Sequence, residues 1–216
     1  LDQDTSVFGV KEAYDDGDAD FHTIVAKMAD IPRSAAKTIN LGLFYGMGKA
    51  KLQAELGVSK DKAEELFSIY HNRVPFVKSL TKSVSNRAQQ RGQIRTLLGR
   101  LCRFHLWEPN TFGMHKALPF EQAVQEHGPG IKRAYTYKAL NKLIQGSAAD
   151  MTKKSMLDLY KEGIVAHIQI HDELDVSVES PEQAKKIVEI MENAVKLEIP
   201  NKVDYESGKN WGTIND

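Results

Sequence analysis

The sequence is poor in the residues that mark several classes of protein. It has a single cysteine, Cys102, which excludes an internal disulfide and a metal site built from several cysteines. It has no run of 18 apolar residues, which excludes a membrane-spanning helix. It has no surplus of either charge, because 29 basic residues balance 29 acidic ones. What is present, 216 residues with 41% apolar side chains, is enough for one domain or two small subdomains around a buried core.

The charges are unevenly distributed along the chain. Residues 1–30 hold two basic and eight acidic side chains, whereas residues 31–103 hold 14 basic and four acidic ones. The second block, with a balance of +10, is a candidate surface for a polyanion. Solvated helix faces would show the same composition, so charge alone does not separate the two interpretations.

Apolar periodicity and turn signals predict a mainly helical chain, with helix ends marked by N-cap residues, prolines and glycines. The expected helices run from Phe21 to Met28, from Arg33 toward Tyr45, from the N-cap Ser59 to Tyr70, from Pro75 to Gln90, from Arg133 to Lys161 and over residues 181–196. Residues 94–104 are typical of short extended pieces around Gly99. Residues 105–131 show no period and are predicted to form an irregular insertion or long loop.

The most regular pattern predicts a β-hairpin near the end of the chain. Apolar residues occupy the even positions from 164 to 170 and again from 174 to 178. Facing residues of an antiparallel pair share one side of the sheet, so burial of the even positions in both strands requires an odd number of turn residues. We therefore expect a three-residue turn, His171-Asp172-Glu173, with Ile170 opposite Leu174, unless a bulge shifts the count.

One group of residues with chemical potential lies on the second expected helix. Arg33, Lys37, Leu41 and Tyr45 are spaced by four and form one stripe. Two cations one turn apart could bind a polyphosphate, with arginine as a planar fork and lysine as a point charge. A solvated face beside a core leucine and tyrosine would have the same spacing.

Two further groups consist of carboxylates and amides. A carboxylate at the tip of a tight turn, such as Asp172, can supply one ligand of a Mg²⁺ site, but a complete two-metal site needs another carboxylate from elsewhere. The same three residues could form a plain polar turn. Asn141 and Gln145 lie one turn apart on the long helix, where amides can read base edges or sugars or simply lie on a packed helix surface.

Together these segments resemble the family A DNA polymerases, the group of bacterial polymerase I and phage replicative enzymes. Residues 33–46 resemble the fingers-helix motif of that family, residues 141–150 its long palm helix, and His171-Asp172-Glu173 its third palm motif. Residues 20–22, 96–100 and 208–212 are similar to further family segments in the same order. The resemblance covers nearly the whole chain, with residues 105–131 as its least familiar part.

The resemblance implies an α+β fold of right-hand architecture that is predominantly helical. Residues 1–95 would form the helical, triphosphate-binding fingers subdomain. Residues 96–216 would form the C-terminal part of the palm, with the long helix, the His-Asp-Glu hairpin and a closing helix. The first palm motif, the thumb and an exonuclease domain would lie outside these 216 residues.

The function implied by the resemblance is template-directed DNA synthesis, in which a nucleotide passes from a dNTP to a primer 3′ end by a two-Mg²⁺ mechanism. The residues implied to bind dNTP are His22, Arg33, Lys37, Leu41 and Tyr45, and Lys37 would also assist pyrophosphate departure. Those implied to bind primer–template DNA are Thr96, Arg100, Asn141, Gln145 and His171. Asp172 would bind the catalytic metal with support from Glu173. The enzyme would be a soluble one of the bacterial cytoplasm or a phage-infected host, with no membrane partner.

Three features depart from the family pattern. Leu41 stands where phenylalanine or tyrosine usually faces the incoming sugar, so we expect altered sugar discrimination. Tyr137 stands where many relatives have arginine, so we expect one minor-groove contact to be lost. The first palm motif, which supplies the other metal-binding aspartate, should lie upstream of Asp2. Because the chain also begins with Leu1 rather than methionine, we expect a truncated piece that is inactive without an upstream palm and thumb portion, in cis or as a separate chain.

Other interpretations stay open on the sequence. The chain could be half of a split polymerase or a non-catalytic DNA-binding remnant. It could also come from a single-subunit RNA polymerase, although Glu173 and residues 145–149 favour the DNA enzymes. A metal phosphohydrolase fits poorly, because the other six histidines show no ligand spacing around His171.

Overall fold

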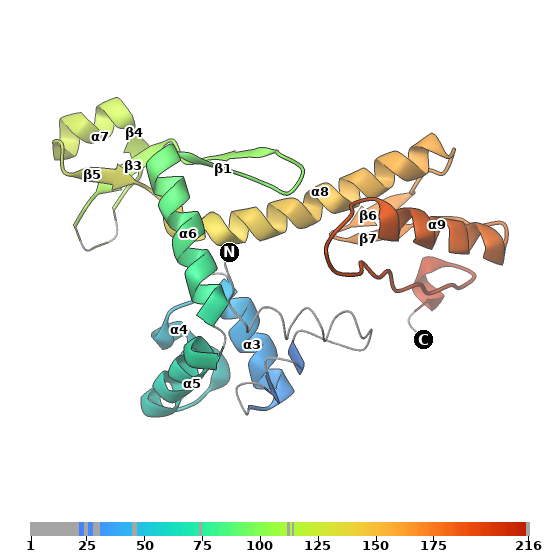
Figure 1. Cartoon of the computed structure of the whole chain (residues 1–216), viewed down its shortest axis with the longest axis horizontal. Coiled ribbons are helices and arrows are strands. Elements are labelled where there is room, and N and C mark those ends of the chain that lie inside the picture. The colour runs from blue at the N-terminus through green and yellow to red at the C-terminus, as the bar shows by residue number, and fades with distance from the viewer. Residues whose placement is uncertain are drawn as a thin grey trace. The chain divides into compact units, whose positions relative to one another are not determined.

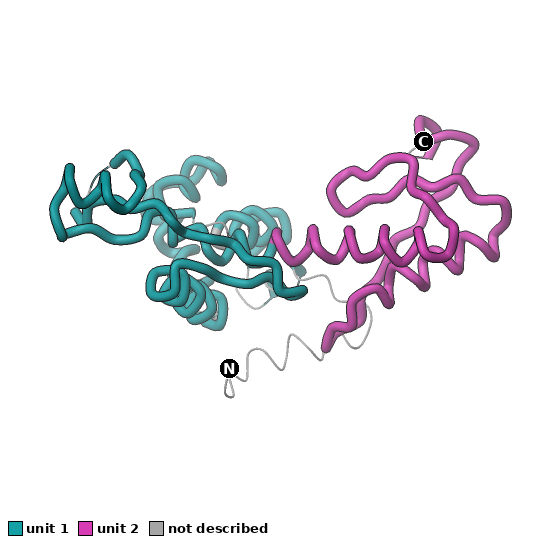
Figure 2. The backbone as a smooth tube through the Cα atoms, turned by 90° about the horizontal axis from the view of Figure 1, so that it is seen from above, with its two compact units in different colours: residues 1–144 teal, residues 145–216 magenta. Residues whose placement is uncertain are grey.

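The computed structural model describes residues 22–23, 26–27, 31–44, 47–73, 75–111, 113 and 115–214. Helices predominate and the described strands form small antiparallel sheets, so the predicted α+β class is confirmed (Figure 1). The backbone divides into two compact units, residues 1–144 and 145–216 (Figure 2). The fingers and palm subdomains stay a prediction, because these units reflect contacts alone. No helix of the described segments is long and apolar enough to span a lipid bilayer.

Helices form the first part of unit 1. They include α3 (Arg33–Phe44), α4 (Lys49–Leu56), α5 (Lys60–Arg73) and α6 (Pro75–Arg91). The Ser59 hydroxyl accepts a hydrogen bond from the Lys62 amide at 3.2 Å, which confirms the predicted N-cap of α5. Helix α4 was not predicted. It buries Leu52, and one buried side chain gives no apolar period to recognise.

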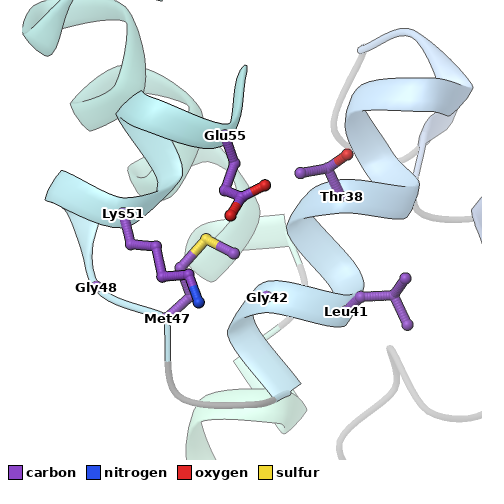
Figure 3. Close-up of a pocket in the computed structure, with 7 residues that line it drawn as sticks. All are labelled: Thr38, Leu41, Gly42, Met47, Gly48, Lys51 and Glu55. Carbon is purple, nitrogen blue, oxygen red and sulfur yellow. The ribbon is translucent and has the colours of Figure 1, made fainter. Parts of the chain in front are cut away.

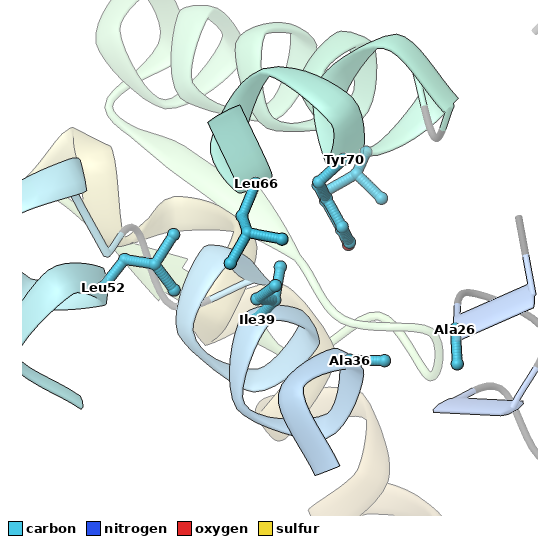
Figure 4. Close-up of a cluster of buried hydrophobic side chains, with 7 residues drawn as sticks. Ala26, Ala36, Ile39, Leu52, Leu66 and Tyr70 are labelled. Atoms are coloured by element: carbon cyan, nitrogen blue, oxygen red, sulfur yellow. The ribbon is translucent and has the colours of Figure 1, made fainter. Parts of the chain in front are cut away.

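A buried apolar cluster joins α3, α4 and α5 (Figure 4). Ile39 of α3, Leu52 of α4 and Tyr70 of α5 are completely shielded from solvent at its centre. Burial of this apolar surface stabilises the helices and fixes which side of α3 faces inward. The same burial raises the pKa of the Tyr70 phenol, so the ring stays neutral.

A short hairpin follows α6, where short extended pieces were predicted around Gly99. Strand β1 (Gln93–Arg95) pairs antiparallel with β2 (Leu101–Arg103). Gly99 has a φ of 87°, in the left-handed region that glycine adopts at little cost. The Thr96 amide donates to the Arg100 carbonyl at 2.9 Å, and the Thr96 hydroxyl accepts from the Arg100 amide at 3.0 Å. These two hydrogen bonds between Thr96 and Arg100 therefore stabilise the turn.

The segment predicted to be an irregular loop, residues 105–131, instead forms a small sheet and a helix. Its elements are β3 (Leu106–Pro109), β4 (Leu118–Pro119), α7 (Phe120–His127) and β5 (Ile131–Arg133), with strand order β4–β3–β5. The Trp107 ring meets the Phe120 ring edge-on with centroids 5.0 Å apart. The Arg133 guanidinium lies 4.5 Å from the Trp107 centroid. Strands of two to four residues are too short to show a period of two, so sequence reasoning missed them.

The long helix begins later than predicted. A 3₁₀ turn, η1 (Thr136–Lys138), leads into α8 (Ala139–Lys161). The predicted start, Arg133, belongs to β5, and Tyr135 has a φ of 60°, which an α-helix does not allow. At the other end Gly163, with a φ of 77°, follows the last turn of the helix as predicted.

Unit 2 contains the predicted hairpin and closing helix. Its elements after α8 are β6 (Ile168–Ile170), β7 (Glu173–Asp175), α9 (Pro181–Asn193) and η2 (Trp211–Thr213). The Ser180 hydroxyl accepts from the Gln183 amide at 3.2 Å, which confirms the predicted N-cap of α9. The core of this unit consists of Leu159, Ile164 and Ile187, with Leu174, Val176, Ile190 and Met191 packed against it.

The β6–β7 turn is one residue shorter than predicted. Ile170 pairs with Glu173, so the turn consists of His171 and Asp172 alone. The His171 φ of 53° supplies the left-handed backbone that two-residue hairpin turns favour. The alternation of apolar residues could not reveal the length of the turn, because the backbone conformation of His171 decides how many residues the turn contains.

The shorter turn moves one set of side chains to the other side of the hairpin. Gln169, rather than Ile170, lies opposite Leu174. Leu174 packs against the core of unit 2, whereas Ile168 and Ile170 are 47% and 36% exposed. The expectation that the even positions of both strands are buried together was therefore wrong for β6.

Candidate functional site

The predicted stripe of cations lies on the exposed side of α3. Arg33 and Lys37 are exposed, and Leu41, one turn further on, is 42% exposed. The opposite side of the helix is the one that packs into the core. Helix α3 therefore presents two cations to solvent one turn apart on a face that the core fixes. Tyr45, the last member of the predicted stripe, lies outside the described residues.

Two residues that precede α3 are held against it by side-chain hydrogen bonds. Arg33 Nε donates to Thr23 Oγ1 at 3.2 Å, and Asn40 Nδ2 lies 3.1 Å from His22 Nδ1. An amide nitrogen only donates, so His22 Nδ1 accepts and the ring hydrogen is on Nε2. His22 is therefore held against α3, the helix that carries the other predicted residue, Arg33.

Asn40 is a residue that sequence reasoning did not single out. It is 1% exposed, and its Oδ1 has no hydrogen-bond partner in the described part of the chain. A buried amide oxygen without a partner costs stability, so its place on an otherwise apolar face needs a reason. The bond to His22 supplies that reason. The sequence gives only a weak indication of this role, namely that Asn40 is a polar residue on the apolar side of the expected helix.

A cavity of about 410 Å³ lies between α3 and α4 (Figure 3). It is lined by Thr38, Leu41, Gly42, Met47, Gly48, Lys51 and Glu55. At Gly42 a Cβ would come within 2.1 Å of the Met47 Cε, so glycine lets the methionine lie against α3. Leu41 belongs both to the exposed stripe and to this lining. A change at Leu41 would therefore alter both.

The β6–β7 turn presents the predicted histidine and carboxylates to solvent. His171, Asp172 and Glu173 are all exposed. The Gln169 side-chain amide donates to the His171 carbonyl at 2.5 Å and braces the turn, a role that sequence reasoning missed. Within the described segments, no three His, Cys, Asp or Glu side chains are grouped to hold a metal ion. The hairpin tip offers fewer ligands than a two-metal site needs.

The residues predicted to contact DNA occupy two kinds of environment. Thr96 is buried and its hydroxyl is engaged in the β1–β2 turn, so it positions Arg100, which is exposed. Asn141 is half-buried and Gln145 is exposed, one turn apart on α8. Asn141 belongs to unit 1 with His22 and the α3 stripe, whereas Gln145 and the hairpin tip belong to unit 2.

The chain is similar in sequence to known polymerases. A family model described as DNA polymerase family A matches residues 9–213. The DNA-directed DNA polymerase of Pseudomonas phage M6 is 32% identical over 231 residues, covering 91% of this chain and 32% of the phage protein. The thermostable DNA polymerase I of Thermus filiformis is 32% identical over 186 residues, covering 83% of this chain and 20% of that protein.

The fold is similar to that of a solved structure. This is the POL domain of Pol1 from M. smegmatis in complex with DNA primer-template and dNTP. The TM-score is 0.76 at 27% sequence identity, covering 96% of this chain and 37% of that chain. The chain therefore spans about a third of the phage relative and of the solved domain, and about a fifth of the Thermus enzyme.

Proposed function

We propose that this chain, which belongs to DNA polymerase family A, supplies the part of a template-directed DNA polymerase that holds the triphosphate of the incoming dNTP and a carboxylate ligand of the catalytic metal ions. The observation that supports this most is the exposed Arg33–Lys37 pair on α3, whose opposite side is buried. The similar POL domain was solved with DNA primer-template and dNTP. We propose the same two substrates here.

Arg33 and Lys37 suit a triphosphate because they are four residues apart on one helix, about 6 Å along the axis. Two like charges at this spacing disfavour an isolated helix, and a bound polyphosphate would convert that repulsion into attraction. The hydrogen bonds to Thr23 and from Asn40 hold Arg33 and His22 in place. His22 would be a third residue that contacts the phosphate oxygens. Lys37 would neutralise charge on the departing pyrophosphate.

Asp172 suits a Mg²⁺ ligand because its carboxylate is a hard oxygen donor exposed at a tight turn. Bound metal ions would neutralise charge on the transferring phosphoryl group. Glu173, fixed in β7, would support the site from the adjacent position, and His171 would contact the primer terminus. Leu41 would face the incoming sugar with an aliphatic side chain, which would alter sugar discrimination.

The primer–template would lie along the part of the basic block that carries Arg100 and along the amide residues of α8. Arg100 is presented by a turn that Thr96 closes, and backbone phosphates are the natural partners of such cations. Asn141 and Gln145 would contact base edges or sugars of the duplex.

We also propose that the 216 residues alone do not extend a primer. Asp172 and Glu173 are too few ligands for two metal ions, and the further aspartate would come from the upstream palm motif, in cis or on a separate chain. Primer extension with Mg²⁺ and dNTPs tests this. We expect no product from the isolated chain, and robust Mg²⁺-dependent extension would contradict the proposal.

A chimera tests the central function. In what we call the phage chimera, this chain replaces the segment of the Pseudomonas phage M6 polymerase that it matches. We expect Mg²⁺-dependent primer extension by the phage chimera, with its rate strongly reduced by Lys37→Ala and reduced further by Asp172→Asn. Lys82→Ala, an exposed cation on α6, should retain extension. An extension rate unchanged by both Lys37→Ala and Asp172→Asn would overturn the proposal.

A second readout keeps the test decisive if the phage chimera fails to fold. Equilibrium binding of a labelled dNTP to the 216-residue chain, with primer–template present, should weaken with Lys37→Ala and not with Lys82→Ala. Equal binding by the wild type and Lys37→Ala would contradict the proposed role of α3.

A second candidate, a DNA-binding remnant without chemistry, is favoured by the +10 block, since the described residues contain no group of three metal-ligating side chains. It predicts salt-sensitive binding of primer–template by the chain. It also predicts a folded phage chimera that binds DNA and makes no product.

A further inference from the structure

A half-buried arginine, Arg133, contacts segments of unit 1 that are far apart in the sequence. It is the last residue of β5, shortly before α8 begins. Its Nη1 donates to the Phe104 carbonyl at 2.9 Å, and its guanidinium lies 4.5 Å from the centroid of the Trp107 ring. Among the described residues no carboxylate pairs with it. A half-buried cation without an ion pair costs desolvation energy, so its retention indicates that the fold uses the geometry of the guanidinium.

The guanidinium of Arg133 contacts the base of the β1–β2 hairpin. A Cβ at Gly92 would come within 2.7 Å of the Arg133 Cζ, and Gly92 has a φ of 67°, a conformation that glycine adopts at little cost. The Phe104 amide donates to the Gly92 carbonyl at 2.8 Å. Gly92 directly precedes β1 and Phe104 directly follows β2, so the guanidinium lies against both ends of the hairpin.

The backbone of Arg133 is held as well. The side-chain amide of Gln89, near the end of α6, accepts from the Arg133 backbone amide at 2.9 Å and donates to the Arg133 carbonyl at 3.2 Å. The chain then continues through η1 into α8. One residue thus connects the end of α6 and the base of the hairpin to the segment that begins the long helix.

An apolar cluster joins the same elements without fixing their orientation. Ile94 of β1 and Phe104 pack in this cluster with Ala139 and Leu140 of α8. Apolar contacts are non-directional, whereas hydrogen bonds and a guanidinium stacked on a ring have preferred geometries. Arg133 therefore supplies directional contacts where the core supplies only close packing.

We propose that Arg133 is a positioning residue for DNA binding, which fixes the β1–β2 turn that carries Arg100 relative to the start of α8 that carries Asn141. The inference rests on the proposed function, because that function takes Arg100 and Asn141 as contacts of the primer–template. Two side chains on different elements reach one duplex together only when those elements keep a fixed relation. All of these residues belong to unit 1.

The proposal gives the small β4–β3–β5 sheet a role in the proposed site. Trp107 of β3 is the direct cross-strand partner of Arg133 of β5, and the Phe120 ring of α7 meets the Trp107 ring edge-on. The sheet and α7 together hold the indole on which the guanidinium lies. Direct binding of a DNA phosphate by Arg133 fits less well, because its guanidinium already contacts Trp107, Gly92 and the Phe104 carbonyl.

A double-mutant cycle tests the inference, with fluorescence anisotropy of a labelled primer–template bound to the 216-residue chain. We expect Arg133→Lys to weaken binding about three- to tenfold, part of the effect of one charged hydrogen bond, although the charge is unchanged. In the Arg100→Ala background the same substitution should weaken binding less than about twofold, because the relative placement of two contacts no longer matters once one is absent. Equal effects in the two backgrounds would overturn the inference. So would wild-type affinity of Arg133→Lys, the result expected of an arginine that binds phosphate by its charge alone.

The affinity for dNTP separates positioning from a general loss of structure. With primer–template at saturating concentration, binding of a labelled dNTP should be unchanged by Arg133→Lys, because α3 packs in a different apolar cluster. A parallel loss of both affinities would overturn the inference and indicate a purely structural role. The matched control is Lys116→Gln, which changes an exposed cation in the segment between β3 and β4 and should leave both affinities unchanged.

A second pair of variants keeps the test decisive if Arg133→Lys fails to fold. Trp107→Leu removes the ring on which the guanidinium lies and should weaken primer–template binding about as much as Arg133→Lys, whereas Trp107→Phe keeps a ring and should weaken it less. Equal effects of the two would overturn the inference. Failure of the proposed function is distinguishable, because Arg100→Ala would then leave primer–template binding unchanged. Failure of this inference alone leaves the effect of Arg100→Ala in place.

Discussion

The α3 stripe and the β6–β7 hairpin tip are supported in different ways. The cations of α3 stand on a helix whose other side is completely buried at Ala36 and Ile39, so packing decides which way they face. The hairpin tip stands on three residue pairs, and Ile168 and Ile170 of β6 are exposed. A two-stranded hairpin with little burial is marginally stable in water. We infer that the core positions the residues proposed to bind the triphosphate, whereas one left-handed residue positions the proposed metal ligand.

The largest expected effect is at the hairpin tip. Asp172→Asn in the phage chimera should reduce primer extension by at least about 1,000-fold, because a metal ion contributes several kcal/mol to charge neutralisation in the transition state. Single-turnover extension measures this. Glu173→Gln should cost less, since Glu173 is placed in the strand rather than in the turn. A larger loss for Glu173→Gln would reverse the roles assigned to the two carboxylates.

The two regions should differ strongly in their contribution to stability. Ile39→Ala removes a completely buried side chain and should lower the free energy of unfolding by about 2–4 kcal/mol. Ile170→Ala, at an exposed position, should lower it by less than about 1 kcal/mol. Urea denaturation followed by circular dichroism compares them. Equal losses would show that the hairpin packs as firmly as α3.

The exposed side of α3 should matter for substrate rather than for folding. Lys37→Ala in the phage chimera should lower kcat/KM for dNTP about 10- to 100-fold, the range for loss of one charged hydrogen bond. Its unfolding midpoint should stay close to that of the wild type, because Lys37 is exposed. Lys82→Ala serves as the control for net charge. A shift in stability without a change in kcat/KM would contradict the division between the two sides of the helix.

The smallest expected effect concerns the turn itself. His171→Val should destabilise the hairpin by about 1–2 kcal/mol, because a β-branched residue at a φ of 53° is strained. His171→Asn should be tolerated, since asparagine adopts left-handed backbone more readily. Hydrogen exchange at the β6 and β7 amides measures both. Equal exchange in the two variants would show that His171 does not set the turn.

Sequence reasoning succeeded where a period repeats over several turns. Periodicity and capping chemistry alone predicted the helices α3, α5, α6 and α9 and the N-caps Ser59 and Ser180. It failed where one backbone angle decides the outcome. The φ of His171 shortened the hairpin turn, and that of Tyr135 is incompatible with helix at that position. Neither angle is encoded in a pattern of apolar residues.

Contacts between residues that are distant in the sequence could not be predicted either. The strands of the β4–β3–β5 sheet are too short for a period, and Trp107, Phe120 and Arg133 meet only in the folded chain. The hydrogen bond between Asn40 and His22 joins residues 18 positions apart, and no local motif predicts it.

The central claim is that α3 holds the triphosphate while Asp172 holds a catalytic metal. A crystal structure of the phage chimera with primer–template, a nonhydrolysable dNTP and Mn²⁺ tests it most directly, because Mn²⁺ is located by its anomalous scattering. We predict an anomalous peak at the Asp172 carboxylate and phosphate oxygens within hydrogen-bond distance of Arg33 and Lys37. A triphosphate bound away from α3, or Mn²⁺ bound away from Asp172, would contradict the account.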